Sequence, residues 1–172
     1  MQKLVVLSDN HSNRKVVEEI FKQYEQEQVT FIHCGDSEFP AKDKLWEDVV
    51  TVTGNCDFDA GYAESHQLEI EGHSIFVTHG HLYGLNLGLP FLVKECKKRA
   101  ADMVLFGHIH RPVAEIVEGV LCINPGSVTQ SRDAYIRIPT YATVTIDGNT
   151  VEVVHYTTDH EALLEHKFTL EV

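Results

Sequence analysis

Residues 4–11 read Leu-Val-Val-Leu-Ser-Asp-Asn-His, an apolar run of four residues followed directly by polar and metal-ligating side chains. A short apolar run with branched side chains predicts a strand that is buried on both faces. Residues 16–24 then place apolar side chains on one stripe at helical spacing, after Ser12 or Asn13 as a candidate N-cap. A second apolar run follows at 31–34. This order of strand, helix and strand predicts an α/β fold.

Similar apolar runs recur along the chain, and each predicts another buried strand. These further runs lie at 49–52, 75–78, 103–106 and 120–123, and a second helix is expected across 89–100. After residue 119 the pattern changes to strands joined by turns, with runs at 141–146 and 151–156 on either side of the hairpin loop 147–150.

The end of the chain has weaker signals. Asp159 is a candidate cap for a short final helix over 161–166, and residues 168–172 predict a last strand or a docked tail. The predicted architecture is a single domain, residues 1–172, of the α/β class. We expect a four-layer α-β-β-α sandwich of two mixed sheets flanked by helices.

The composition argues against several classes of function. Acidic residues outnumber basic ones by 26 to 14, which gives a formal net charge of -12, and there is no long stretch of lysine and arginine. Long nucleic acids are therefore not expected as partners, and a small anionic substrate would need local positive charge such as bound metal ions. No apolar stretch approaches the roughly 20 residues that span a bilayer. The 4 widely spaced cysteines and the lack of a signal-like start predict a cytoplasmic protein with no membrane partner.

Metal-ligating side chains directly follow five of the apolar runs. They are Asp9 and His11, Asp36, Asn55, His79, and finally His108 and His110. In open α/β sheets ligands bind at the carboxyl ends of the strands, so these side chains are expected to converge. Taken singly, Asp9 and Asp36 could be helix N-caps and Gly54-Asn55 an ordinary turn. Their occurrence at five strand ends favours a metal site.

The ordered series Asp9-Xaa-His11, Gly35-Asp36, Gly54-Asn55, His79 and Gly107-Xaa-Xaa-His110 resembles the calcineurin-like metallophosphoesterase superfamily. Within it, the chain is similar to the small YfcE-like phosphodiesterases of bacteria and archaea. The resemblance runs from residue 4 to about residue 132, because Asn124-Pro125-Gly126-Ser127 also matches that branch.

This resemblance implies two divalent metal ions that share Asp36. One ion would lie between Asp9, His11, Asp36 and His110, and the other between Asp36, Asn55, His79 and His108. Carboxylates, imidazoles and an amide oxygen form a mixed ligand set that suits Mn²⁺, our first choice, or Fe²⁺, Zn²⁺ or Ni²⁺ better than Ca²⁺. A water held between two such ions would attack phosphorus in line while the ions neutralise the phosphoryl oxygens. We therefore expect a dinuclear metal-dependent phosphodiesterase acting on a small or nucleotide-like ester.

Cys56 stands where many phosphatases of the superfamily have a histidine after the Gly-Asn pair. A thiol is a poor general acid at neutral pH, so substrates with good leaving groups, such as activated aryl phosphodiesters, should react best. His81 is the nearest candidate for the missing catalytic role, unless it is an ordinary loop histidine. Asn10 and Arg132 are candidates for binding the substrate phosphate, and Asn10 also for a catalytic contact. Ser127 lacks the nucleophile-elbow spacing of a serine hydrolase and is expected to shape a loop beside the metal site.

Two other functions stay open. The chain could be a metal-binding scaffold like the small retromer subunit of this superfamily, or a phosphomonoesterase. The presence of all seven ligand side chains favours an enzyme, because a scaffold does not need them. The apolar and aromatic stretch 135–141 leaves a homo-oligomer possible, with burial against the second sheet as the alternative.

Overall fold

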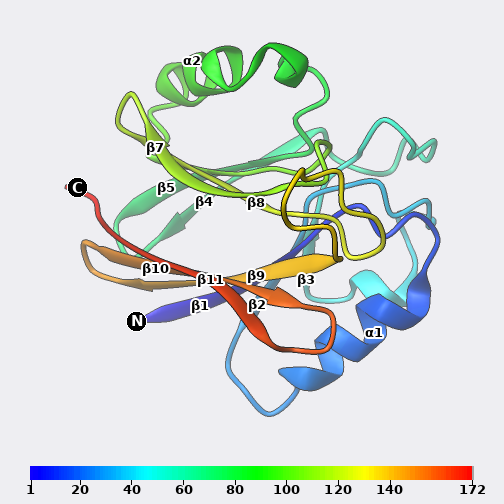
Figure 1. Ribbon diagram of the computed structural model, residues 1–172. Coiled ribbons are helices and arrows are strands. Elements are labelled where there is room, and N and C mark those ends of the chain that lie inside the picture. Colours follow the sequence, from blue (N-terminus) through cyan, green and yellow to red (C-terminus); the bar gives the residue numbers. More distant parts are fainter. Residues whose placement is uncertain (172) are drawn as a thin grey trace.

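The computed structural model describes residues 1–171 and is built in four layers (Figure 1). Helix α1 (Arg14–Gln23) covers one sheet and helix α2 (Pro90–Lys98) covers the other, while the two sheets pack face to face between them. The predicted α-β-β-α sandwich is confirmed. Among residues 1–171, no helix is both long and apolar enough to cross a membrane.

The first sheet has six strands in the order β11-β10-β9-β1-β2-β3. Its central strand β1 pairs in parallel with β2, which pairs in parallel with β3, whereas β9, β10 and β11 run antiparallel to their neighbours. The strands are β1 (Gln2–Leu7), β2 (Thr30–His33), β3 (Val49–Thr51), β9 (Thr140–Asp147), β10 (Thr150–Thr157) and β11 (Ala162–Thr169).

The second sheet has five strands in the order β4-β5-β6-β8-β7. Strands β5, β6 and β8 are parallel, and the edge strands β4 and β7 are antiparallel to them. The strands are β4 (Ser65–Ile70), β5 (His73–Thr78), β6 (Met103–Leu105), β7 (Pro112–Val117) and β8 (Val120–Pro125). Two short 3₁₀ turns, η1 (Lys44–Trp46) and η2 (Leu85–Leu87), complete the elements.

The continuous apolar runs arise because the central strands are covered on both faces. In β1, Leu4 and Val6 pack into the core between the sheets, whereas Val5 and Leu7 pack under α1. All four side chains are fully buried. Because both faces of such a strand are apolar, its carboxyl end is where polar residues first become possible. That end of the sheet carries the candidate site.

The capping prediction for α1 is confirmed at Asn13, whose side chain accepts a hydrogen bond from the backbone N–H of Val16 at 3.3 Å. The cap satisfies one of the free N–H groups at the start of the helix. It also ends the loop that carries Asp9 and His11, so the helix anchors that loop.

The predicted final helix over 161–166 is wrong. These residues belong to β11, which pairs antiparallel with β10 along its length. Strand β10 supplies hydrogen-bond partners along one edge of these residues, which outweighs a weak local helix signal. Residues 168 and 169 are strand, as expected, and residue 172 lies outside the described part of the chain. Strands β4 and β7 were not predicted, because they are half-exposed edge strands with mixed polar and apolar residues.

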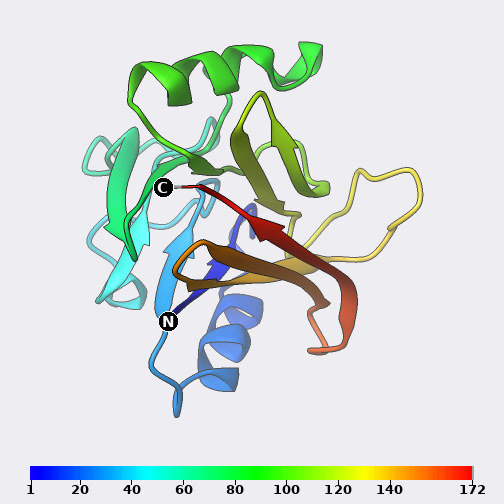
Figure 2. The same cartoon turned by 90° about the vertical axis from the view of Figure 1, so that its left-hand side faces the viewer.

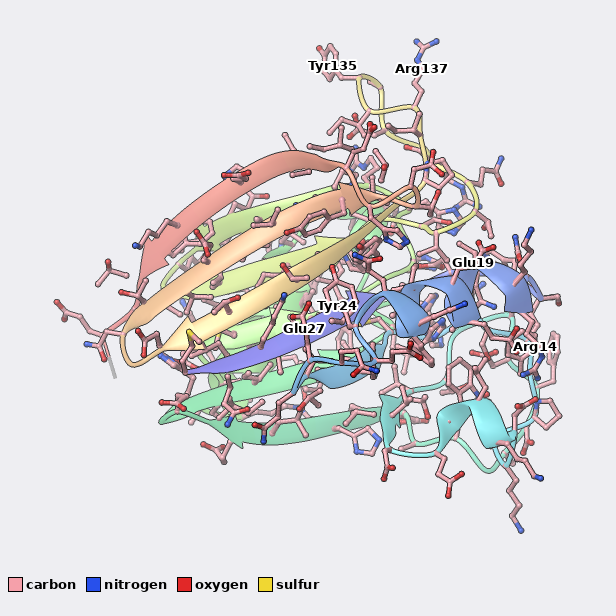
Figure 3. The ribbon with its side chains drawn as sticks, turned by 90° about the horizontal axis from the view of Figure 1, so that it is seen from below. Arg14, Glu19, Tyr24, Glu27, Tyr135 and Arg137 are labelled. Carbon is pink, nitrogen blue, oxygen red and sulfur yellow. The ribbon has the colours of Figure 1, made fainter. Side chains whose placement is uncertain are left out.

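The loop between β8 and β9 projects from the body of the molecule (Figure 2). At its tip, Tyr135 is 94% exposed and points away from the sheets, as does Arg137 (Figure 3). Tyr141, at the end of the same apolar stretch, is fully buried under α1. The stretch is therefore divided between surface and core, and self-association through Tyr135 stays a prediction.

His155, on β10, is expected to make folding sensitive to acid. Its ring is fully buried, Nε2–H donates to the carbonyl oxygen of Asn124 at 2.8 Å, and Nδ1 has no partner among the described residues. Burial lowers the pKa of His155 from 6.5 to about 4. Between these two pH values the unfolded chain binds the extra proton, so this contribution to stability is present above pH 6.5 and is lost as the pH falls towards 4.

We expect His155→Gln to reduce the difference in unfolding free energy between pH 7 and pH 5 by about 2 kcal/mol. Urea unfolding of both proteins in the presence of a chelator measures this, because metal binding would add its own pH dependence. An unchanged difference in His155→Gln would show that the ring is not buried in its neutral form.

Candidate metal centre

The predicted ligands converge at the carboxyl ends of five strands from both sheets. Asp9 and His11 follow β1, Asp36 follows β2 and Asn55 follows β3, while His79 follows β5 and His108 and His110 follow β6. Because β1 is central in one sheet and β6 in the other, the two sets of loops meet where the sheets pack together. The sandwich thus brings together residues that are up to about a hundred positions apart in sequence.

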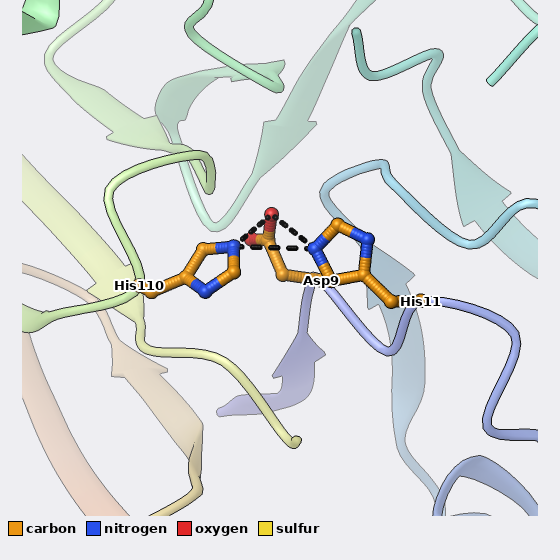
Figure 4. A group of neighbouring side chains, drawn as sticks. All are labelled: Asp9, His11 and His110. Carbon is orange, nitrogen blue, oxygen red and sulfur yellow. Dashed lines mark hydrogen bonds and ion pairs between the residues drawn. The ribbon is translucent and has the colours of Figure 1, made fainter. Parts of the chain in front are cut away.

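Asp9, His11 and His110 point toward one another and form a first group (Figure 4). Nε2 of His110 lies 3.1 Å from Oδ1 of Asp9, and Nε2 of His11 lies 3.3 Å from Nε2 of His110. Nε2 of His11 is also 4.0 Å from Oδ2 of Asp36. The four side chains predicted to hold one metal ion are therefore neighbours.

Asp36 also belongs to a second group. Its Oδ2 lies 3.3 Å from Nε2 of His79, which in turn is 3.1 Å from Oδ1 of Asn55. His108 is more distant, with its ring centroid 5.2 Å from that of His79. The structure thus places Asp36, 2% exposed, between the two predicted ligand sets.

Three of the four histidines turn their Nε2 atoms toward the centre, because their Nδ1 atoms are bound elsewhere. Nδ1–H of His79 donates to the carbonyl oxygen of Cys34 at 2.6 Å, and Nδ1–H of His110 donates to that of Gln130 at 2.9 Å. Nδ1–H of His11 donates to Glu38 at 2.9 Å. Metal-ligating histidines almost always bind a carbonyl or carboxylate through their second nitrogen in this way, which fixes the ring and its tautomer.

The same tautomers create a local need for positive charge. With Nδ1–H of His110 donated to Gln130, the neutral ring turns a lone pair toward the Asp9 carboxylate, so two acceptors face each other. Oδ1 of Asp9 is buried and has no hydrogen-bond partner among the described residues. A divalent cation would satisfy both atoms, whereas a buried carboxylate without a partner is costly. The residues present therefore fit a metal ion.

The electrostatic environment keeps Asp36 ionised. Burial by itself would raise the pKa of this carboxyl, but in the metal-free protein a protonated His79, which donates from Nε2 and carries positive charge, and the N–H of Cys56 outweigh burial and lower the pKa. The pKa of Asp9 is also lowered, because His110 and His79, when protonated, outweigh the effect of burial. Both carboxylates are thus in the form that binds cations.

Five of the seven predicted ligands have left-handed backbone conformations. The φ angles are 58° at Asp9, 40° at His11, 58° at Asp36, 70° at His108 and 54° at His110. Non-glycine residues seldom adopt positive φ, and such strain persists where the surrounding structure imposes it, often at functional sites. The backbone strain therefore recurs on the loops that carry the candidate ligands, and all five residues are Asp or His, which adopt positive φ more often than most other non-glycine residues.

Asp57 is a supporting residue that sequence reasoning missed. Its Oδ2 accepts hydrogen bonds from the N–H groups of Asp36 at 2.8 Å and Gly54 at 2.7 Å, and its Oδ1 accepts from Glu38 N–H at 2.7 Å. One carboxylate thus joins the loop after β2 to the loop after β3. The sequence shows only an aspartate three residues after Gly54 in a predicted turn. That pattern does not reveal that Asp57 binds backbone groups of another loop.

We expect Asp57→Asn to weaken Mn²⁺ binding by roughly ten- to 100-fold, because the amide would turn an NH₂ group toward backbone donors and release the ligand loops. Titration calorimetry with Mn²⁺ measures the change. Asp59→Asn is the matched control, because Asp59 also accepts two backbone N–H bonds, from Ala41 and Gly61, but does not bind the backbone of Asp36 or Gly54. Equal Mn²⁺ affinity in Asp57→Asn and wild type would exclude this positioning role.

The segment Asn124-Pro125-Gly126-Ser127 lies against the same loops, as expected. The Ser127 hydroxyl is 1% exposed and donates to the carbonyl oxygen of Asp9 at 2.9 Å. The Asn124 amide donates to the carbonyl oxygen of Gly107 at 2.7 Å. Ser127 is thus a structural residue that fixes the Asp9 loop, not an exposed nucleophile.

The remaining predicted residues lie around the centre, and their roles stay predictions. The His81 ring centroid is 5.3 Å from that of His79, and burial followed by the neighbouring His79 lowers the pKa of His81. The Asn10 amide is buried and occupied, because Oδ1 accepts from His33 at 2.8 Å and Nδ2 donates to the Asn13 carbonyl at 3.3 Å. Arg132 is exposed and lines a cavity with His108.

Cys56 packs beside Asp36, to whose Oδ1 its backbone N–H donates at 2.7 Å. Burial, together with the Asp36 carboxylate, raises the pKa of its thiol to about 11. The side chain lies near His11 and Asp36, within the distance expected of a shared metal site. As a protonated thiol it is a weak acid and a weak ligand.

Comparison with known proteins agrees with the fold and identifies the family. Residues 2–149 match the model of the calcineurin-like phosphoesterase superfamily domain. The probable metallophosphoesterase YsnB of Bacillus subtilis is 34% identical over 153 residues, which cover 89% of each chain. The phosphodiesterase YfcE of Escherichia coli is 29% identical over 155 residues, which cover 75% of this chain and 80% of YfcE.

Solved structures show the same likeness. A conserved uncharacterized protein of Streptococcus pneumoniae TIGR4, described as a predicted phosphoesterase, superposes with a TM-score of 0.91 at 37% identity and covers 98% of this chain and 97% of its own. Zinc-bound Vps29 of Entamoeba histolytica has a TM-score of 0.79 at 17% identity, covering 99% of this chain and 100% of its own, which is a likeness of fold alone.

An α-β-β-α sandwich that gathers aspartate, histidine and asparagine at the carboxyl ends of its central strands is the framework of a metal-dependent phosphoesterase. The chain belongs to the calcineurin-like phosphoesterase superfamily. The family predicted from the ordered ligand series is therefore confirmed, and with it a hydrolase class that uses divalent metals to act on phosphoesters.

Proposed function

We propose that the protein is a phosphodiesterase with two divalent metal ions, and that it hydrolyses a small or nucleotide-like phosphodiester. The observation that supports this most is the position of Asp36, with one oxygen within 4.0 Å of Nε2 of both His11 and His79. One carboxylate between two ligand groups is the arrangement that a pair of ions sharing a ligand requires. Asp9, His11, Asp36 and His110 would hold one ion, and Asp36, Asn55, His79 and His108 the other.

When bound, the ions supply a water that is acidic enough to attack phosphorus and positive charge that stabilises the phosphoryl oxygens. The protein supplies the fixed geometry. Glu38, Cys34 and Gln130 orient three histidines through their Nδ1 atoms, and Asp57 holds the Asp36 and Gly54 backbones. We propose Mn²⁺ as the metal and place Fe²⁺, Zn²⁺ and Ni²⁺ as alternatives.

Diesters with good leaving groups are the preferred substrates in this proposal, because we find no strong proton donor facing the centre among residues 1–171. The Cys56 thiol has a pKa raised to about 11, and the lowered pKa of His81 favours its neutral form near pH 7. His81 therefore remains a candidate for accepting a proton or contacting substrate more than for protonating a leaving group. Asn10 is better placed to position the loop between Asp9 and His11 than to bind phosphate.

A cavity of about 550 Å³ beside Cys56 offers space for an aromatic ester group. Its walls include Phe39, Phe58 and Pro40, and the Phe58 side chain is 95% exposed. Glu38 and Cys56 also line it, and they contact His11 and Asp36 respectively. An aryl or nucleobase group bound against Phe58 would therefore lie next to the metal centre. The relative YfcE is named a phosphodiesterase, which supports the proposal that the substrate is a diester.

A scaffold function like that of Vps29 is the second candidate, supported by the shared fold. The oriented histidines and the unpartnered Asp9 oxygen argue against it, because a binding surface does not require a strained and electrostatically demanding centre. A small phosphoester remains the proposed partner, in preference to long nucleic acid or membrane. Cytoplasmic location and homo-oligomer formation stay predictions.

The proposal is tested by assaying metal-stripped protein on bis-p-nitrophenyl phosphate and on p-nitrophenyl phosphate after adding Mn²⁺, beside Asp36→Ala. We expect Mn²⁺-dependent turnover of both, with higher kcat/KM for the diester, and bound metal approaching two ions per chain. Turnover by the wild type no higher than by Asp36→Ala would reject the enzyme. A higher kcat/KM for the monoester would instead select the phosphomonoesterase alternative.

A further inference from the structure

Two arginines without carboxylate partners lie beside the metal centre. Arg111 and Arg132 line a cavity of about 320 Å³ whose wall also includes the predicted metal ligand His108. Arg14 is paired with Asp43 and Arg99 with Glu95. Among residues 1–171, neither Arg111 nor Arg132 forms an ion pair. In a chain with a net charge of -12, two free guanidinium groups at one cavity are unexpected.

Both arginines are attached to the backbone of His110. Arg111 is the next residue in the chain, and the backbone N–H of Arg132 donates to the carbonyl oxygen of His110 at 2.9 Å. The ring of His110 is fixed in turn by the Gln130 carbonyl. The starting points of the two side chains are therefore fixed relative to the metal centre, while both side chains are exposed to solvent.

Asp133, an acidic side chain close to Arg111, is mainly engaged elsewhere. Asp133 lies close enough to Arg111 for the arginine to contribute to the lowered pKa of its carboxyl, but the main causes are hydrogen bonds from the backbone N–H groups of Ile136 and Tyr135. Each of these bonds is 2.8 Å long and ends on Oδ1 of Asp133. The guanidinium groups consequently remain available to an anion from solution.

The charge at this cavity exceeds what a simple diester needs. A phosphodiester carries one negative charge, and the proposed metal ions supply positive charge at the reacting phosphate. Arginines match phosphate oxygens with several directed N–H donors, so a pair of them suits a second phosphate group.

We propose that Arg111 and Arg132 form a subsite for a second phosphate group, so that the substrate is a small phosphodiester carrying a further phosphate. This inference rests on the proposed function, which places the scissile ester at the metal centre. Binding of an anion to the subsite can nevertheless be measured without turnover. The cavity beside Phe58 is lined by Cys56, which contacts the candidate ligand Asp36, whereas the cavity beside the arginines is lined by the candidate ligand His108. Aromatic and anionic groups of one substrate would thus have separate places.

The test compares thymidine 5′-monophosphate with thymidine 3′,5′-bisphosphate as ligands of the Mn²⁺-loaded protein, using titration calorimetry at fixed ionic strength. We expect the wild type to bind the bisphosphate at least tenfold more tightly. This preference should fall to about twofold or less in Arg111→Gln/Arg132→Gln and be intermediate in each single variant. Arg137→Gln is the control, because this substitution removes one positive charge from the β8–β9 loop that also carries Arg132. The Arg137 side chain points away from the body and does not line the cavity (Figure 3).

A wild-type preference below about twofold, or a preference that survives in the double variant, would overturn the proposal. An equal loss in Arg137→Gln would also overturn it, because the effect would then come from general surface charge. Turnover of bis-p-nitrophenyl phosphate by the wild type is measured in parallel. If that turnover fails while the arginine-dependent preference holds, the proposed function falls and the anion subsite stands; the reverse result leaves the enzyme without this subsite.

Discussion

Asp36→Asn is expected to reduce phosphodiester turnover by roughly 10³-fold and to lower the metal content from two ions per chain to one or none. The substitution keeps the size of the side chain but removes the charge shared by both ligand groups. The substitution also replaces one carboxylate oxygen with an NH₂ group. Both oxygens are used, because Oδ1 accepts from Cys56 N–H and Oδ2 faces His11 and His79. An amide cannot be an acceptor on both sides. Turnover of bis-p-nitrophenyl phosphate and metal analysis after gel filtration measure the two effects.

Asp147→Asn is the matched control, because this aspartate is at the far end of β9 and its side chain is 72% exposed. It should retain wild-type turnover and metal content. If Asp36→Asn also retained two ions, Asp36 would not be the shared ligand, whatever the loss of turnover. If it retained turnover, the metal centre would not be the site of reaction.

The central strands were predictable because each is covered on both faces. Runs such as 103–106 alternate between the core under α2 and the core between the sheets, so every position is apolar. Edge strands lack this signal. Strand β4 has exposed residues at alternate positions, and β11 is mostly exposed, so their local sequence favours no single structure. They form because a neighbouring strand offers hydrogen bonds, which is information about tertiary structure.

The convergence of the candidate ligands was predictable for a related reason. Where a strand that is buried on both faces ends, an aspartate or histidine stands out against the apolar run before it. The residues that orient those ligands carry no such mark. Ser127 contacts the Asp9 carbonyl across 118 positions of sequence, and Asp57 contacts Asp36 across 21. Two of the orienting acceptors are backbone carbonyls, of Cys34 and Gln130, to which any residue type could contribute.

Gly54→Ala is expected to weaken Mn²⁺ binding by roughly 100-fold or more, although it adds a single methyl group. A Cβ at Gly54 would lie 2.0 Å from Oδ1 of Asp36 and 2.5 Å from its backbone nitrogen. The carboxylate alone cannot relieve the clash, because that backbone nitrogen is held by Asp57, which also holds Gly54 N–H. The methyl group must therefore separate the two loops that carry Asp36 and Asn55, and a displacement near 1 Å at a catalytic group is costly.

Gly119→Ala separates this effect from a loss of stability. Gly119 lies in the turn between β7 and β8, and a Cβ there would meet no atom within 4 Å, but its φ of +86° strains any other residue. Alanine should therefore lower the melting temperature there while Mn²⁺ affinity, measured by calorimetry, stays at the wild-type value. Equal Mn²⁺ affinities in Gly54→Ala and wild type would mean that the loops after β2 and β3 move independently. Gly54 would then be needed only for the conformation of its own turn. The position of the Asp36 carboxylate would not require the ends of β2 and β3 to lie close together.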